Sequence, residues 1–277
     1  MITRAAAARV AAAGLFTLVS LVILVPMLLL VLGPFRDPTG IVTHGAIALP
    51  ESWNLHNFSR ILVTFHFATY FLNSIIVTVP VVTVSLLLAI LAAFALAWMR
   101  FPLRGLIGVV VTVVAVMVSE QFIMIPLYVL MKSLHLVDTF LSVILPQVAE
   151  SAAISTFVIR SFFVSLPEEL IDASLEDGCS SWTLLWRILV PIATPAILTC
   201  TTLTATWTWN DFILPVVLLP SPARATLPLG LVIFQGGHTI DIPLTITGAL
   251  VTALPMLVVF FAFQRHVARG LLQGVSR

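Results

Sequence analysis

Charge is what this sequence has least of. Charged residues make up 9% of its 277 residues and hydrophobic residues 60%, whereas an ordinary soluble domain is about 25% charged. The mean hydropathy is +1.14. Because so few charged side chains are available to cover a water-exposed surface, the composition predicts an integral membrane protein. The net charge of +1 gives no reason to expect nucleic acid as a partner.

Cysteine and lysine are also scarce. The two cysteines, Cys179 and Cys200, suggest neither a disulfide framework nor a metal pair. The single lysine, Lys132, follows Met131 rather than a glycine, so the chain lacks a P-loop to cradle nucleotide phosphates. No His-Glu-x-x-His or Gly-x-Ser-x-Gly pattern is present. We therefore expect no catalytic site, no metal site and no cofactor in this chain.

Long apolar runs, in contrast, are abundant. Six of them are long enough to cross roughly 30 Å of hydrocarbon as helices, which predicts an all-α bundle with both termini on one side. They cover residues 11–32, 70–98, 106–131, 140–163, 191–218 and 243–263. The first has the basic flank of a signal peptide, but its apolar part is too long for one. We expect it to remain as a membrane helix.

Basic residues are divided unevenly between the two sides of this predicted bundle. Nine arginines fall on the side of the termini, and only four basic residues fall on the other. By the positive-inside rule, the termini and the loop at about 164–190 are expected to be cytoplasmic. We treat residues 1–277 as a single domain with a core bundle at about 69–263 and a cytoplasmic tail at 264–277.

The loop between the fourth and fifth runs concentrates the acidic residues. Five carboxylates fall within residues 168–177 and no basic residue joins them. At 100° per residue, Glu168, Glu169, Asp172 and Glu176 share one helical face. Like charges at i, i+4 weaken an isolated helix by about 0.2–0.5 kcal/mol per pair, and a basic partner surface would reverse that penalty. The stretch therefore predicts a docking element, and an acidic helix that merely faces water is the plainer alternative.

The ends and the opposite face of this helix can also be predicted. Ser165 with Glu168 suggests a capping box, and Gly178 suits a left-handed residue that ends the helix. Either Ser180 or Ser181 is expected to cap the helix that follows. The apolar face is expected to carry Leu166, Leu170, Ala173 and Ser174, with Ile171 and Leu175 along its border.

The same loop resembles the cytoplasmic coupling motif of ABC importer membrane subunits. That motif reads Glu-Ala-Ala, three residues, Gly, nine residues, Ile, one residue and Leu-Pro. The matching positions are Asp172, Ala173, Ser174, Gly178, Ile188, Val190 and Pro191, with conservative departures at 172, 174 and 190. The resemblance implies that ATPase subunits are coupled through Glu168, Glu169, Asp172, Ala173, Ser174, Glu176, Gly178, Ile188 and Pro191.

Other segments resemble membrane subunits for carbohydrate uptake. They are 70–74, 125–128, 209–212 and the tail from Gly270, which matches the family at Gly270 and Gly274 and departs at Val275 and Ser276. The resemblance implies the type I ABC importer permease fold, with six transmembrane helices and a cytoplasmic coupling helix, in a bacterial-type inner membrane. It implies four kinds of partner: a second six-helix permease forming a heterodimer, two copies of a cytoplasmic subunit that binds ATP and Mg, an extracytoplasmic substrate-binding protein, and membrane lipid.

Polar and acidic side chains also occur inside the predicted spans. They are Asn73, Glu120, Gln121, Gln147, Glu150, Asn210 and Asp211. Intramembrane carboxylates usually face the bundle interior, a partner or a wet cavity, so these positions predict a translocation path. Interhelical hydrogen bonding is the competing interpretation, because polar side chains also hold membrane helices together.

We therefore expect the permease of an ATP-driven sugar importer, with ATP hydrolysed by partner subunits. A disaccharide, an amino sugar, a polyol and a glycerol phosphate are all open as substrates. Two alternatives belong to other classes: a proton-coupled secondary transporter with Glu120 and Glu150 as its relay, and a membrane scaffold that transports nothing. An inverted internal repeat would favour the secondary transporter, and none is evident, whereas the acidic docking helix favours the importer.

Overall fold

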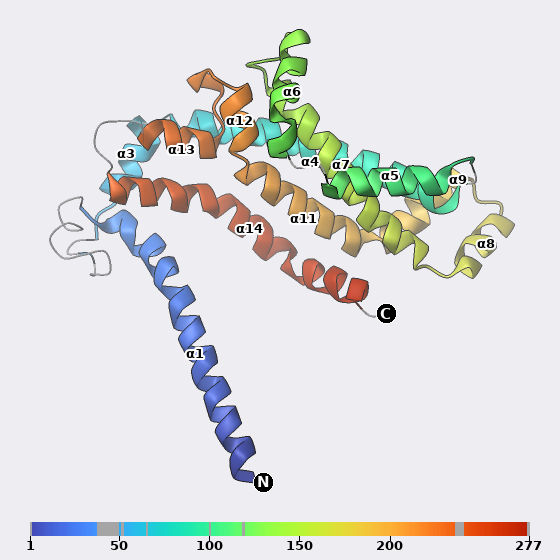
Figure 1. The fold of residues 1–277 in the computed structure, drawn as a ribbon, viewed down its shortest axis with the longest axis horizontal. Helices are drawn as coiled ribbons and strands as arrows, with labels where there is room; N and C mark the ends of the chain where they lie inside the picture. The colour runs from blue at the N-terminus through green and yellow to red at the C-terminus, as the bar shows by residue number, and fades with distance from the viewer. Residues whose placement is uncertain are drawn as a thin grey trace. The chain divides into compact units, whose positions relative to one another are not determined.

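Helices account for the secondary structure throughout the described part of the chain. The computed structural model describes residues 2–37, 50, 53–64, 66–99, 101–117, 120–235 and 241–275, and within them no strand occurs. The elements in chain order are α1 (Ile2–Leu32), η1 (Gly33–Phe35), α3 (His56–Thr64), α4 (Phe67–Trp98), α5 (Arg104–Met117), α6 (Glu120–Ser133), α7 (Phe140–Val164), α8 (Glu168–Glu176), α9 (Ser181–Thr183), η2 (Leu184–Leu189), α10 (Val190–Ile192), α11 (Thr194–Asn210), α12 (Ile213–Leu218), η3 (Pro222–Arg224), α13 (Leu227–Gln235) and α14 (Ile242–Val275) (Figure 1). The all-α prediction is confirmed.

Four of these helices are long and apolar enough to cross a membrane. Among the described residues they comprise 12–35, 67–98, 140–164 and 242–262, in agreement with the first, second, fourth and sixth predicted spans. The fifth predicted span, 191–218, differs from the structure. A bent pair of segments, 181–192 and 194–210, meets at 75°, and residues 213–218 form the separate short helix α12. Four long helices contain a proline, such as Pro80 in α4 and Pro146 in α7, as transmembrane helices can.

The described part of the third predicted span, 106–131, comprises two helices, neither of spanning length. In the described residues α5 ends at Met117 and α6 begins at Glu120, and each has 14 residues. At 1.5 Å per residue, 14 residues cover only about 21 Å, which is less than the hydrocarbon thickness. The predicted count of six spans is therefore not confirmed.

The described chain divides into two compact units. The first comprises Met1–Ala68 and Leu231–Leu254, and the second comprises Thr69–Gly230 and Pro255–Arg277. In the first unit, the amide of Asn57 donates to the carbonyls of Pro34 and Arg36, at 2.9 Å each. The Arg60 guanidinium pairs with Asp241 at 2.8 Å, and Asp241 also caps the start of α14. These contacts hold α3 beside η1 and the start of α14.

The second unit is built on α4 and α7, which contribute to both of its apolar clusters. One cluster joins these two helices to α8, η2 and the start of α11. The other joins them to α6 and α12. α5 packs along α7, and α11 packs against α7 as well. The unit therefore has a core at each end of the α4–α7 pair, and each core has a candidate site next to it.

Candidate functional site

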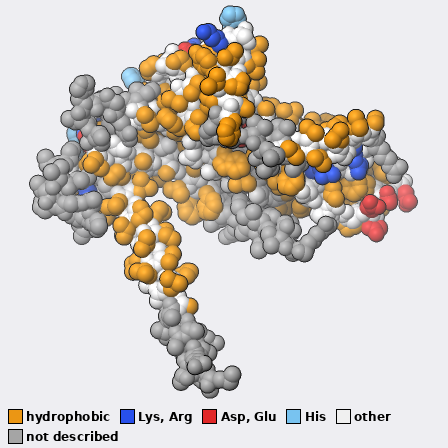
Figure 2. Space-filling model, in the orientation of Figure 1, with side chains coloured by type: hydrophobic (Ala, Val, Ile, Leu, Met, Phe, Trp, Pro, Cys, Tyr) orange, Lys and Arg blue, Asp and Glu red, His pale blue; other side chains and the backbone are white. Residues whose placement is uncertain are grey.

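Helix α8 exposes its acidic residues. Glu168, Glu169, Asp172, Glu176 and Asp177 are all exposed, and none forms an ion pair with another described residue. Figure 2 shows a cluster of acidic side chains, in red, where α8 lies in Figure 1. The four predicted to share a face thus present an unpaired negative surface.

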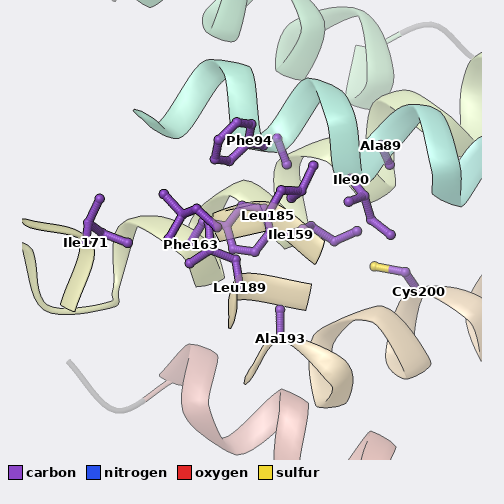
Figure 3. Close-up of a cluster of buried hydrophobic side chains, with 12 residues drawn as sticks. Ala89, Ile90, Phe94, Ile159, Phe163, Ile171, Leu185, Leu189, Ala193 and Cys200 are labelled. Atoms are coloured by element: carbon purple, nitrogen blue, oxygen red, sulfur yellow. The ribbon is translucent and has the colours of Figure 1, made fainter. Parts of the chain in front are cut away.

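The opposite face of α8 packs against its own bundle. Ile171 is 4% exposed and belongs to the same cluster as Phe163 of α7 and Leu185 and Leu189 of η2 (Figure 3). Ser174 is also buried, and its hydroxyl donates to the Leu170 carbonyl at 2.7 Å. α8 is therefore fastened to the bundle chiefly by one isoleucine.

This orientation corrects the predicted apolar face. Ala173, placed on that face by the sequence, is exposed, whereas Ile171, placed at the border, is buried. The reason is area: an isoleucine removes more apolar surface from water than an alanine, so burying Ile171 is the more stabilising rotation of the helix. Leu166 and Leu170 are half-buried, as the pattern indicated.

The ends of α8 bear out one prediction and contradict another. Gly178 has φ +79°, the left-handed conformation expected of a helix terminator. The capping box predicted for Ser165 and Glu168 is wrong. Ser165 ends α7 instead, its hydroxyl donates to the Phe162 carbonyl at 2.7 Å, and Pro167 occupies the N-cap position of α8.

The segment after Gly178 carries the rest of the predicted coupling positions. Ser180 caps α9 by accepting a hydrogen bond from the Thr183 amide at 3.2 Å, as predicted. Residues Leu184–Leu189, directly after α9, form the π-helix η2. This is a rare form of helix that is frequent at functional sites. Ile188 lies within η2 and is half-buried against the core, whereas Pro191 lies just after η2 and is exposed. The 75° bend then leads into α11.

A second candidate site lies where α7 meets the end of α11. Gln147 is 4% exposed, and its Nε2 donates to Asp211 Oδ2 at 2.5 Å. The other oxygen of Asp211 accepts from the amides of Ile213 and Leu214, at 2.9 and 3.4 Å, and so begins α12. One carboxylate therefore fixes both the helix break and the α7 contact.

Two further predicted path residues lie beside this pair. Glu150 follows Gln147 by three residues, on the same face of α7, and is half-buried. Asn210 is exposed, and its amide donates to the Thr206 carbonyl at 2.8 Å. The side chains of Glu120 and Gln121, which begin α6, lie outside the described residues. The structure thus brings Gln147, Glu150, Asn210 and Asp211 together.

Asn73 has a different environment. It is buried, and its amide donates to the carbonyls of Ala223 and Ala225, at 2.9 Å each. Its neighbour Ser74 accepts a hydrogen bond from the Leu227 amide at 2.8 Å, which caps α13. Phe71, two residues earlier, contacts the Trp209 ring edge to face at 5.6 Å. The segment at 70–74 thus holds η3 and the start of α13 in place.

Sequence reasoning missed one polar network near the second core. The Asp138 carboxylate accepts hydrogen bonds from the Ser221 hydroxyl and from Arg224, at 2.6 Å each. These bonds lower the pKa of Asp138, with the Ser221 hydroxyl as the largest cause. Asp138 has φ +62°, a conformation that Asp adopts more readily than most residues. Its partners lie more than 80 residues away, so no local pattern could have indicated the pairing.

Known proteins resemble this chain over nearly its whole length. The family model described as binding-protein-dependent transport system inner membrane component matches residues 9–273. The arabinooligosaccharides transport system permease protein AraQ of Halalkalibacterium halodurans is 31% identical, covering 94% of this chain and 93% of that protein. The diacetylchitobiose uptake system permease protein NgcG of Streptomyces coelicolor is 31% identical, covering 95% and 87%.

A solved structure has the same fold. A chain of a bacterial ABC transporter involved in import of the acidic polysaccharide alginate matches with a TM-score of 0.76, at 21% identity, and covers 92% of this chain and 95% of that one. The fold agrees with the predicted importer permease class. The family match over residues 9–273 shows that the chain belongs to the binding-protein-dependent transport system inner membrane components, the membrane-spanning permeases of ABC importers.

Proposed function

We propose that this chain forms half of the translocation path of a sugar importer and that α8 couples it to a cytoplasmic ATPase. The printed names of two relatives, for arabinooligosaccharides and diacetylchitobiose, support a carbohydrate substrate. The partners are a second permease, two ATPase copies that bind ATP and Mg, and an extracytoplasmic binding protein. ATP is hydrolysed by the partner, since this chain has no P-loop.

One observation carries the coupling role: α8 buries Ile171 in its own chain and leaves its carboxylates outside, with Ala173 and Leu175 also exposed. Ile171 is 4% exposed, whereas the four carboxylates on the acidic face are exposed. The surface left for a partner is therefore acidic, and it fits a basic groove. Charge complementarity of this kind sets association rate and specificity more than raw affinity.

The route from α8 into the bundle follows from the same packing. Ile171 lies in one apolar cluster with α7, η2 and the start of α11 (Figure 3). A displacement of α8 by closing ATPases therefore pushes directly on η2 and on the bent segment before α11. Packed cores respond to such a push by switching between discrete arrangements rather than by stretching, which suits alternating access.

The translocation path in this proposal uses Gln147, Glu150, Asn210 and Asp211, together with Glu120 and Gln121. Asn73 is left out, because both of its amide hydrogens are bonded to backbone carbonyls. The termini and α8 are on the cytoplasmic side, where the arginine excess places them. Family membership favours this function over the secondary transporter and the scaffold.

The decisive experiment is copurification of the ATPase with permease variants from detergent. Asp172→Lys with Glu176→Lys should release the ATPase, because repulsion replaces attraction, and raised salt should weaken the unmodified complex. The matched pair Asp172→Asn with Glu176→Gln should weaken binding less. Glu120→Gln with Glu150→Gln should leave the complex intact. Retention by the lysine pair would contradict the coupling role of α8.

Uptake measurements separate the importer from the proton-coupled alternative. Membrane vesicles loaded with ATP are treated either with vanadate, which blocks the ATPase, or with a protonophore. We expect vanadate to abolish uptake and the protonophore to leave it largely unchanged. Uptake that survives vanadate and stops with the protonophore would favour the secondary transporter.

A further inference from the structure

The site around Gln147 contains a polar atom without a partner. Gln147 is 4% exposed, and while its Nε2 donates to Asp211, its Oε1 is buried and accepts no hydrogen bond from the described residues. An unsatisfied buried acceptor is costly, and in native proteins it often marks a water, an ion or a functional role. The amide is therefore poised to accept one further hydrogen-bond donor beside Asp211.

The same site holds two carboxylates without a counter-ion. Neither Glu150 nor Asp211 forms an ion pair with any described residue, and Glu150 lies one helical turn from Gln147, which holds Asp211. Both side chains are only half-buried. Half-exposed carboxylates in contact with lipid would be strongly unfavourable, so this face of α7 and α11 turns toward water or a partner subunit.

The chemistry of these groups decides what they can bind. Ionised carboxylates only accept hydrogen bonds, and so does an amide oxygen whose nitrogen is already engaged. Hydroxyl and ammonium groups are donors that fit such a site. Phosphate and carboxylate groups lack donors when ionised and are repelled by the two negative charges.

We propose that Glu150 and Asp211, positioned by Gln147, form a negatively charged, acceptor-only face of the translocation path that admits neutral polyhydroxyl or ammonium-bearing sugars and excludes anionic ones. This inference rests on the proposed function, because it requires that the face line the path. Among the substrates left open by the sequence, it selects disaccharides, amino sugars and polyols against glycerol phosphate.

The test measures the local charge with a reporter cysteine. Asn210→Cys is introduced into a chain carrying Cys179→Ser and Cys200→Ala, and the complete importer is studied in membrane vesicles. Asn210 suits the reporter because it is exposed and adjacent to Asp211. The rate at which the introduced thiol is modified is measured with two methanethiosulfonates, one bearing a trimethylammonium group and the other a sulfonate group. Each rate is divided by the rate at which the same reagent modifies a free thiol in solution.

We expect the cationic reagent to be favoured by about tenfold or more, the range that charged clefts produce. Glu150→Gln or Asp211→Asn should reduce that ratio, and both together should bring it close to one. Asp211→Asn keeps an oxygen that can cap α12, which limits the disturbance of the fold. Ser133→Cys, exposed at the end of α6, is the control, and its ratio should not respond to either change.

Two results would overturn the inference. One is a Cys at position 210, introduced by Asn210→Cys, that reacts with neither reagent in the folded protein but reacts in the denatured protein. That result would show that the face is not open to water. The other is a ratio near one, or a ratio that the neutral variants leave unchanged. Either result leaves the proposed function standing if vanadate still blocks uptake. Retention of the ATPase by the lysine pair, or uptake that survives vanadate, would instead count against the proposed function, and neither result measures the charge beside Asn210.

Discussion

The chain has two acidic regions, and they are built in opposite ways. α8 has the arrangement of a soluble protein, with Ile171 inside and its carboxylates outside. The Gln147–Asp211 region has polar groups within the bundle, where a buried amide holds a carboxylate at 2.5 Å. Identical carboxylate groups are therefore left free for a partner in one region and fixed by tertiary hydrogen bonds in the other.

The two regions are therefore sensitive to different substitutions. α8 has many charges that contribute little to folding, since exposed and unpaired groups rarely affect stability by more than about 0.5 kcal/mol. Its stability depends on the few residues that fasten it to the core. In the bundle, polar residues contribute to folding themselves, because a buried donor or acceptor left without a partner is costly.

The largest effect is expected on the buried face of α8. Ile171→Ala should lower the free energy of unfolding by about 2–5 kcal/mol, because it leaves a cavity in the cluster shared with α7 and η2. Leu175→Ala, four residues on and 50% exposed, should change it by less than about 0.5 kcal/mol. Thermal unfolding of the purified complex measures both. Equal effects would mean that α8 is not fastened through Ile171.

The next effect tests a buried amide in the bundle. Asn73→Ala removes both donors from the carbonyls of Ala223 and Ala225, and Ala225 is fully buried. We expect a loss of about 1–3 kcal/mol in unfolding free energy. Asn210→Ala, which removes an exposed amide, is the control and should be nearly neutral. A similar loss in both variants would remove the contrast between buried and exposed amides.

Local features of the fold could be predicted from the sequence, and tertiary ones could not. The positive φ of Gly178 follows from residue type and position and was predicted, and Ser180 is one of the two serines predicted to cap the next helix. The rotation of α8 was misjudged because it depends on which side chain the core accepts. The Ser165 capping box failed because α7 extends to Val164 and uses that hydroxyl itself.

The candidate sites divide in the same way. The acidic face of α8 is contiguous in sequence, so periodicity was enough to find it. The Gln147–Asp211 hydrogen bond joins residues 64 positions apart, and the Asp138–Arg224 pair joins residues 86 apart. Sequence predicted Gln147 and Asp211 as path residues one by one, and only the fold shows that they are partners. The π-helix η2 has no recognised sequence pattern.

A smaller effect is expected at the end of α8, where only the backbone is involved. Gly178 has φ +79°, and a Cβ added there would meet no atom within 4 Å. Gly178→Val should therefore cost about 1–2 kcal/mol through backbone strain alone. The subunit should still reach the membrane, with weaker ATPase copurification. Gly178→Asn should be milder, because Asn tolerates the left-handed region. A valine variant absent from the membrane would make Gly178 a folding position.

The smallest effect is expected at Asp138, which combines features of both regions. It is partly exposed, like the carboxylates of α8, and it is hydrogen-bonded, like Asp211. Hydrogen bonds from the Ser221 hydroxyl and the Ser221 amide, followed by the charge of Arg224, lower the pKa of Asp138 below its ordinary value of 3.8. A carboxylate whose pKa is lower in the folded state stabilises it fully above the unfolded value. That contribution should be intact at neutral pH and should fall as the pH drops below about 4 toward the folded pKa. Asp138→Asn should lower the melting temperature slightly at pH 7 and flatten its decline below pH 4, as measured by thermal unfolding across pH 3–7.

Glu176→Gln is the control, since Glu176 is exposed and unpaired among the described residues, and it should leave both quantities unchanged. If the two variants behaved alike, the hydrogen bonds to Asp138 would contribute nothing, and a paired surface carboxylate would be equivalent to the free ones on α8.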